Sequence, residues 1–443
     1  MSEALKNKEI DIAVHSLKDL SSEHFFGGTK FAVVDRDEVR DVAIFNENIA
    51  DLLRAGEKIR IGTCSFRREI LAGDFLKKVL PAYGQKINIE ILPIRGNIDT
   101  RLKKLSEGRY DGIILAFAGI NRMLTSVEHR EYFKLLLSNK RMMVLPLLDC
   151  TPAPCQGAIA AESSPQNERA SYILNCINNI ELYQDCTNEK KIASEYGSGC
   201  IQKFGVTTVK FGAQTSVYAH GIDSNNNEID TWYGLKDIRL NISNFDIINS
   251  DELGFVAEKT ILVSDIPIPS KAVFISHIAA IEMPYIDFSN LRVWTAGIET
   301  WIKLAAKNIW VEGCADSLGF NSIFSILNTP LIDIQNDITV LTNEESAERW
   351  TEDNIKAIAT YSIHYKSDLI DKYKLKSARL IFWSCFAHFN HLKEILPAGV
   401  IHSCLPGKTA ELLRKEGHQP ILFPTKKAFN QWKKKYIQVP SVA

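Results

Sequence analysis

The chain has 443 residues, of which 45% are hydrophobic and 24% charged, the composition of an ordinary globular protein. Its formal net charge of −1 gives no sign of a nucleic-acid partner or of a membrane surface, and no run of about 18 apolar residues predicts a membrane span. Nine cysteines without CxxC pairs and ten histidines without ligand spacing argue for reduced thiols in the cytosol and against a metal site.

The first informative stretch is EIDIAVHSLKDL at residues 9–20. Apolar residues at alternate positions through Val14 predict a mostly buried strand that ends in the polar run His15–Asp19. Ligands of open α/β sheets bind beyond the carboxyl ends of strands, so an ammonium and a carboxylate there suit a substrate with both charges. The alternative is that Asp19 is a solvated helix cap, and this stretch alone favours neither reading.

Five arginines follow three later apolar runs, at or just past the predicted end of each strand. They are Arg67, Arg68, Arg95, Arg101 and Arg122. The planar guanidinium grips a carboxylate through two hydrogen bonds, so five around one crevice would bind a ligand with many carboxylates. A single surface arginine more often pairs with a nearby acid, but five at corresponding positions favour a shared site.

Six short motifs occur in an order that resembles the porphobilinogen deaminase family, also called hydroxymethylbilane synthase. They are HSLKD, GTCSFRR, RGNIDTR, AFAGINR, PCQGA and YGSGC, within residues 1 to about 250. The resemblance implies a cytoplasmic enzyme of tetrapyrrole biosynthesis that condenses porphobilinogen into hydroxymethylbilane and releases ammonia. It implies an α/β fold of two periplasmic-binding-protein-like lobes plus a small α+β domain, and we expect a monomer with no nucleic-acid or membrane partner.

The resemblance also assigns roles to residues. Asp19 matches the catalytic aspartate, whose carboxylate would stabilise the cationic azafulvene left when ammonia departs. Cys200 matches the attachment point of a covalent dipyrromethane cofactor. A cysteine suits this role, because a thiolate is a strong nucleophile toward an azafulvene carbon. The residues that match cofactor-binding positions are Ser16, Lys18, Thr63, Ser65, Arg67 and Arg68. Those that match substrate-binding positions are Arg95, Asn97, Arg101, Arg122 and Gln156.

Two departures from the family pattern accompany the resemblance. Ser198 stands where the family usually has a glycine, and the proline-isoleucine-glycine that usually follows the cysteine is replaced near Gln202. The family normally has a strand and helix upstream of HSLKD, whereas Met1 lies in the helix expected to lead into it. This implies that the first domain is incomplete, either because the true start lies upstream of Met1 or because the chain is damaged. The alternative function is a two-lobed small-molecule binding protein that has lost catalysis.

The predicted elements divide the chain into four units. Residues 1–36 and 154–177 are expected to form an incomplete first α/β lobe, and residues 37–153 a second lobe across a cleft. Residues 178–250 read as the α+β domain that attaches the cofactor, because alternating apolar runs predict antiparallel strands there. A polar stretch at 240–258 is predicted to be a linker.

Residues 259–443 are too long to be the carboxyl-terminal tail that is usual in that family. They twice show a strand, a small-residue turn and an amphipathic helix. This repeat resembles uroporphyrinogen-III synthase, a two-lobed α/β family, and implies cyclisation of hydroxymethylbilane to uroporphyrinogen III. We expect this region to fold when expressed alone, because a linker precedes it. The residues that correspond to cleft positions, each otherwise a capping or turn hydroxyl, are Ser276, Thr300, Tyr361, Ser384 and Thr409.

Overall fold

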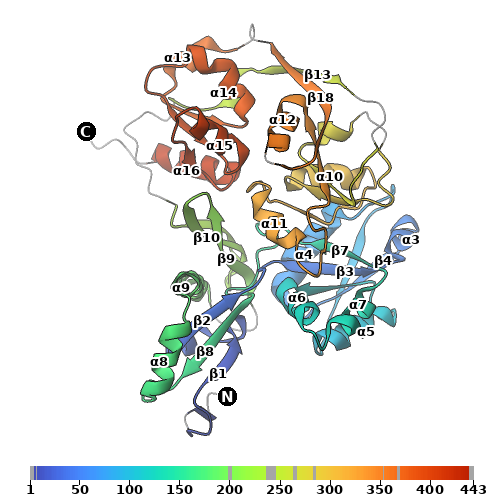
Figure 1. The fold of residues 1–443 in the computed structure, drawn as a ribbon, viewed down its shortest axis with the longest axis vertical. Coiled ribbons are helices and arrows are strands. Elements are labelled where there is room, and N and C mark those ends of the chain that lie inside the picture. Colours follow the sequence, from blue (N-terminus) through green and yellow to red (C-terminus); the bar gives the residue numbers. More distant parts are fainter. Residues whose placement is uncertain are drawn as a thin grey trace.

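The computed structural model describes most of the chain between residues 4 and 438. The described ranges are 4–5, 7–197, 202–235, 246–262, 267–282, 286–352, 354–366 and 370–438. These residues form five sheets, three in the first half of the chain and two in the second (Figure 1). None of the helices in these ranges is long and apolar enough to cross a membrane.

The first lobe is built on a small antiparallel sheet in which β8 lies between β1 and β2. Its elements are β1 (Ala13–Ser16), β2 (Lys30–Arg36), β8 (Ala158–Ser163), α2 (Ser22–Phe26), α8 (Glu168–Ile177) and α9 (Ile180–Glu195). The expectation of a mostly buried strand from Ile10 is wrong, since β1 begins at Ala13 and Val14 is 58% exposed. As an edge strand of a three-stranded sheet, β1 is covered on one face only.

The second lobe has a five-stranded mixed sheet in the order β5-β4-β6-β3-β7. Its strands are β3 (Asp41–Asn46), β4 (Lys58–Gly62), β5 (Asn88–Leu92), β6 (Gly112–Ala116) and β7 (Lys140–Val144). Its helices are α3 (Ile49–Arg54), α4 (Phe66–Val79), α5 (Ile98–Ser106), α6 (Phe117–Thr125) and α7 (Arg130–Leu137). Strands β5, β4 and β6 run parallel, so the turns after them meet at one edge of the sheet.

Two crossing segments, residues 37–40 and 145–157, join the first two lobes. The first runs from β2 to β3, and the second returns from β7 to β8.

A small domain with an antiparallel sheet, ordered β11-β10-β9, lies beside the crossing segments. It packs against α9 through Ile192 and Val206. Its strands are β9 (Lys203–Phe211), β10 (Gln214–Ile222) and β11 (Glu228–Tyr233).

The second half contains two further α/β lobes, in the upper part of Figure 1. The third lobe has a six-stranded sheet of β13 (Val256–Ile261), β18 (Ala357–Lys366), β17 (Ile338–Asn343), β14 (Ala272–Ile275), β15 (Arg292–Thr295) and β16 (Gly313–Cys314), with α10 (Ile298–Ala306), α11 (Asn321–Leu327) and α12 (Glu344–Glu352). The fourth lobe has a parallel sheet of β12 (Ile247–Asn249), β19 (Leu380–Trp383), β20 (Ile401–Cys404) and β21 (Ile421–Leu422), with α13 (Lys372–Ser377), α14 (Phe386–Leu392), α15 (Lys408–Lys415) and α16 (Lys426–Gln438).

The segment expected to be a linker contributes strands to both of these lobes. Strand β12 pairs with β19 in the fourth lobe, and β13 pairs with β18 in the third. The prediction of a linker therefore fails over residues 247–258. Both strands lie at sheet edges: β13 is exposed along its whole length, so its sequence is polar, and β12 is buried but has only three residues.

The third lobe packs directly on the second lobe through a shared hydrophobic core. The rings of Phe75 and Trp301 meet edge to face with centroids 5.1 Å apart, and Phe45 and Trp310 do so at 5.5 Å. The backbone N–H of Val144, at the end of edge strand β7, also donates to the carbonyl of Glu312, at 2.7 Å. The two halves therefore form one packed body.

Candidate functional site

A cavity of about 220 Å³ lies where the first lobe meets the second. Ser16 and Lys18 reach it from the end of β1, and the remaining lining comes mainly from the turns and helices that follow β4, β5 and β6. Four cations from the two lobes line it, and none of its lining residues carries a carboxylate. The full lining is Ser16, Lys18, Arg68, Gly96, Asn97, Ile98, Arg101, Leu115, Ala116, Ala118, Gly119, Arg122 and Gly157.

The positive charges in this cavity act on one another. Burial lowers the pKa of Lys18, and the nearby charge of Arg68 lowers it further. The pKa of Arg101 is lowered by the same two causes, burial first and then Arg68. A bound anion would relieve this repulsion, so the electrostatics of the cavity favour a ligand with several carboxylates.

Only glycine fits at residue 157, where the two crossing segments approach each other beside the cavity. Gly157 has φ +82°, and a Cβ there would lie 2.4 Å from the carbonyl oxygen of Asp37. This close approach lets the carbonyl of Gly157 accept a hydrogen bond from the backbone N–H of Asp37 and another from the guanidinium of Arg122. The two crossing segments and one cation of the cavity are thus connected at a single residue.

Asp41 holds two arginines beneath the cavity. Its carboxylate accepts from Arg67 Nη2 at 2.9 Å, from Arg68 Nη2 at 2.8 Å and from Gln156 Nε2 at 2.8 Å. Burial opposes ionisation of Asp41, but the charges of the two arginines outweigh it and hold the pKa of this carboxyl below its usual value. Arg67 also donates to the carbonyl of Thr151, at 2.8 Å, so it braces a crossing segment and does not line the cavity.

The structure separates the other candidate residues of the first half into two groups. Ser16, Lys18, Arg68, Asn97, Arg101 and Arg122 converge on the cavity. Thr63, Ser65, Arg95, Gln156 and Asp19 do not line it. Ser65 caps α4, accepting a hydrogen bond from the backbone N–H of Arg68, and Thr63 accepts one from the N–H of Ser65 at 3.2 Å. Arg95 is exposed.

Asp19 is exposed at the end of the short helix Leu17–Asp19, and its charge raises the pKa of neighbouring Lys18 against the effect of burial. Cys200 lies outside the described residues.

A much larger cleft, of about 2090 Å³, opens between the third and fourth lobes. Four of the five hydroxyl residues expected at a cleft line it, namely Ser276, Tyr361, Ser384 and Thr409. Thr300 is buried in α10 and is not among the lining residues, so its expected place in the cleft is wrong. Burial raises the pKa of the Tyr361 hydroxyl.

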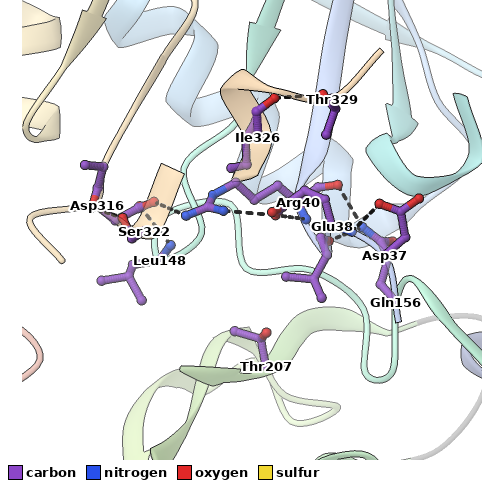
Figure 2. Close-up of polar contacts among 12 residues, drawn as sticks. Asp37, Glu38, Arg40, Leu148, Gln156, Thr207, Asp316, Ser322, Ile326 and Thr329 are labelled. Atoms are coloured by element: carbon purple, nitrogen blue, oxygen red, sulfur yellow. Dashed lines mark hydrogen bonds and ion pairs between the residues drawn. The ribbon is translucent and has the colours of Figure 1, made fainter. Parts of the chain in front are cut away.

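The first half supplies part of the wall of this large cleft. Residues 36–40 line it, as do Lys210, Phe211 and Gly212 at the turn between β9 and β10. Figure 2 shows how Arg40 joins the parts, since it pairs with Glu38 at 2.9 Å and with Asp316 at 3.1 Å. The sequence analysis missed Asp41, Arg40 and Asp316, because their partners are distant in sequence and no local pattern marks them.

Comparisons with known proteins agree on the first half. Residues 1–171 match the family model described as porphobilinogen deaminase, dipyromethane cofactor binding domain. The first half of the chain is similar to porphobilinogen deaminases. A probable porphobilinogen deaminase of Methanocaldococcus jannaschii is 40% identical over 209 residues, which are 46% of this chain and 62% of that protein. The porphobilinogen deaminase of Deinococcus deserti is 35% identical over 222 residues, or 48% of this chain and 63% of the relative.

The chain thus spans less than two thirds of the length of these curated relatives. Among solved structures, a substrate binding protein of an amino acid ABC transporter superposes with a TM-score of 0.21 at 12% identity, over 44% of this chain and 74% of that one. A Salmonella typhimurium periplasmic binding protein gives a TM-score of 0.23 at 12% identity, over 44% and 75%. Superpositions this weak carry no argument about function.

Proposed function

We propose that the first half of the chain condenses porphobilinogen into hydroxymethylbilane. The observation that carries the proposal is the cavity between the first two lobes, where four cations converge and no lining residue is acidic. Porphobilinogen carries an acetate and a propionate on one pyrrole ring, so it presents two carboxylates to such a cavity. The relatives similar to this half are named porphobilinogen deaminases, which supports the same substrate.

In the proposed reaction, the cations of the cavity bind carboxylates. Arg101 and Arg122 bind the acetate and propionate groups of the substrate through charge-assisted hydrogen bonds and orient the ring, while Lys18 and Arg68 hold the cofactor. The aminomethyl C–N bond breaks, ammonia leaves, and the electron-rich pyrrole stabilises the resulting azafulvenium carbon. The free α carbon of the preceding pyrrole then bonds to this carbon and loses its proton.

Asp19 is proposed as the carboxylate that acts at the reacting atoms. Its negative charge would stabilise the azafulvenium cation, and it would give a proton to the departing amine and accept one from the pyrrole carbon. Asp19 follows Lys18 directly, and its exposed carboxylate acts electrostatically on the Lys18 ammonium, which lines the cavity.

The donor set of the cavity also fits the dipyrromethane cofactor of the matched family. A dipyrromethane built from two porphobilinogen units carries several carboxylates, and Lys18 and Arg68 would hold it, which leaves Arg101 and Arg122 for the substrate. When bound, the cofactor supplies the pyrrole carbon from which the chain grows. We propose Cys200 as its attachment point.

We propose further that the large cleft of the second half closes hydroxymethylbilane to uroporphyrinogen III. Its size supports this role, since a cleft of about 2090 Å³ between two α/β lobes has room for a linear tetrapyrrole. Ser276, Ser384 and Thr409 lie in its walls, and Tyr361 offers a phenol. The hydroxyls of Ser276 and Ser384 donate to the carbonyl of Leu341 and to Asn249 Oδ1, so both can accept a hydrogen bond from a ligand. Such a cleft would act mainly by shaping the bilane for ring closure.

The test uses the full chain supplied with porphobilinogen. Turnover to hydroxymethylbilane, followed by the ratio of type I to type III uroporphyrinogen, reports on both halves. Type I product alone would support the first half and contradict the second. A chain that binds porphobilinogen without releasing ammonia would instead be a two-lobed binding protein.

A further inference from the structure

A buried carboxylate in the first lobe lies directly behind the turn that carries Lys18 and Asp19. Glu162 is on the central strand β8 and its side chain is fully buried. Its Oε2 atom is 2.8 Å from His15 Nε2, in a hydrogen bond. Its Oε1 atom lies 2.8 Å from His24 Nε2, but the contact is poorly aligned and neither of those atoms makes a hydrogen bond.

This arrangement is costly unless it has a use. A fully buried carboxylate is destabilising when its charge is not compensated, and a buried acceptor without a hydrogen bond adds to that cost. An apolar residue at 162 would fit the surroundings, because Phe31 lies opposite Glu162 on β2 and Ala13 lies opposite it on β1. The hydrogen bond to His15 is therefore the contact that an apolar residue could not replace.

His15 is the penultimate residue of β1, immediately before the turn at Ser16–Asp19. Because β1 is an edge strand, backbone pairing holds it on one side only. After the turn, the ammonium of Lys190 on α9 donates to the carbonyl of Leu20, and Leu17 within the turn is fully buried. The turn is thus anchored before it by Glu162, in its middle by Leu17, and after it by Lys190.

We propose that Glu162 is a positioning residue for the Ser16–Asp19 turn. Its carboxylate accepts the Nε2–H of His15 and so fixes both the tautomer of that imidazole and the end of β1. The turn then presents Lys18 to the cavity and carries Asp19 directly after it. The inference rests on the proposed function for its effect on catalysis, but its effect on the turn is independent of that function.

The test compares Glu162→Leu and Glu162→Gln with Asn167→Ala in the full chain. Asn167 caps α8 in the same lobe and donates to Asp11 at 2.7 Å, before β1 begins, so its loss weakens the lobe but leaves the contact between His15 and Glu162 in place. Glu162→Leu should lower kcat by about 100-fold through misplacement of the turn, with KM for porphobilinogen within about twofold. Glu162→Gln keeps an oxygen acceptor and should retain most of the activity, and Asn167→Ala should keep its kcat.

Two further measurements make the result independent of turnover. Amide exchange at residues 16–19 should be faster in Glu162→Leu than in wild type or Asn167→Ala, and ¹⁵N NMR of His15 should show loss of the single Nε2–H tautomer. If Glu162→Leu fails to fold, His15→Leu should show the same faster exchange. A wild-type chain without turnover would contradict the proposed function, and the exchange data would then decide this inference. Equal exchange and equal kcat in Glu162→Leu and Asn167→Ala would overturn it.

Discussion

Arg40 and Asp316 form a buried ion pair, 3.1 Å between Nη2 and Oδ2, that joins the two halves of the chain at the crossing segments. Arg40 lies in the first crossing segment, and the other oxygen of Asp316 accepts from the backbone N–H of Leu148 in the second, at 3.3 Å (Figure 2). One carboxylate of the third lobe therefore holds both connections between the first two lobes. The crossing segments between the first two lobes and the wall of the large cleft are parts of the same network.

Removing one partner of this pair should destabilise the whole chain. We expect Arg40→Met to lower the free energy of unfolding by about 3–5 kcal/mol, because Asp316 and Glu38 would keep buried charge without compensation. Arg40→Met combined with Asp316→Leu should cost less than the sum of the two single changes. Urea unfolding measures both. Arg54→Met is the control, since its pair with Asp51 is exposed and should contribute less than about 1 kcal/mol.

Substituting an arginine that lines the small cavity should lower activity more than substituting one that lies outside it. Arg101→Met should lower kcat/KM for porphobilinogen by roughly 10- to 100-fold, the value of one charge-assisted hydrogen bond to a carboxylate. Arg95→Met is the matched control on the same stretch, because Arg95 is exposed and lies outside the cavity. Equal losses in the two variants would show that the arginines provide a general positive field and not defined contacts.

Arg67 should behave as a structural residue. Arg67→Met would leave Asp41 with one arginine fewer and free the carbonyl of Thr151, so we expect a loss of stability by about 3 kcal/mol or more. Any fall in activity should follow the fraction of unfolded protein, as measured by thermal unfolding and turnover on one sample. Activity lost at full stability would place Arg67 in contact with the ligand.

Contrary to the expectation from the sequence, the second half should not fold as residues 259–443 alone. That fragment lacks β12 and half of β13, and it would expose Trp301 and Trp310, which pack on Phe75 and Phe45 in the first half. We expect poor NMR dispersion and strong binding of a hydrophobic dye, whereas the full chain should show neither. A cooperative unfolding transition in the fragment would contradict this.

Asp149 should make stability depend on pH. Burial, followed by the charge of Asp316, raises its pKa to about 6 in the folded chain. The folded pKa of Asp149 is above the unfolded one, so folding favours the protonated carboxyl. The stability of the folded chain is therefore unaffected by this group below about pH 4 and falls as the pH rises through 6. Asp149→Asn should therefore gain about 2–3 kcal/mol relative to wild type between pH 4 and pH 7. Urea unfolding of both proteins at the two pH values measures it, and an unchanged difference would contradict the assignment.

The sequence predicted the parts of the fold that depend on local patterns. Apolar runs followed by arginines located β4, β5 and β6, and their parallel pairing brings Arg68, Arg101 and Arg122 together. Edge strands were the failures, because β1 and β13 have exposed residues that interrupt the apolar pattern, and the buried β12 has only three residues.

Long-range partners could not be predicted at all. Asp41 lies 26 residues from Arg67 in sequence, and Arg40 lies 276 residues from Asp316. Nothing near either carboxylate in sequence indicates a guanidinium partner. The shared core between the halves escaped prediction for the same reason, since Phe75 and Trp301 meet only in the folded chain.

The intact mass of the full chain, purified from cells that make porphobilinogen, tests the central claim most directly. The account predicts the added mass of one dipyrromethane, located by peptide mapping on Cys200 and absent from Cys200→Ser. Cys155 is the internal control, because it is fully buried and its pKa is raised by burial, which disfavours the nucleophilic thiolate. An unmodified mass together with no consumption of porphobilinogen, or an adduct on Cys155 or Cys64, would contradict the account.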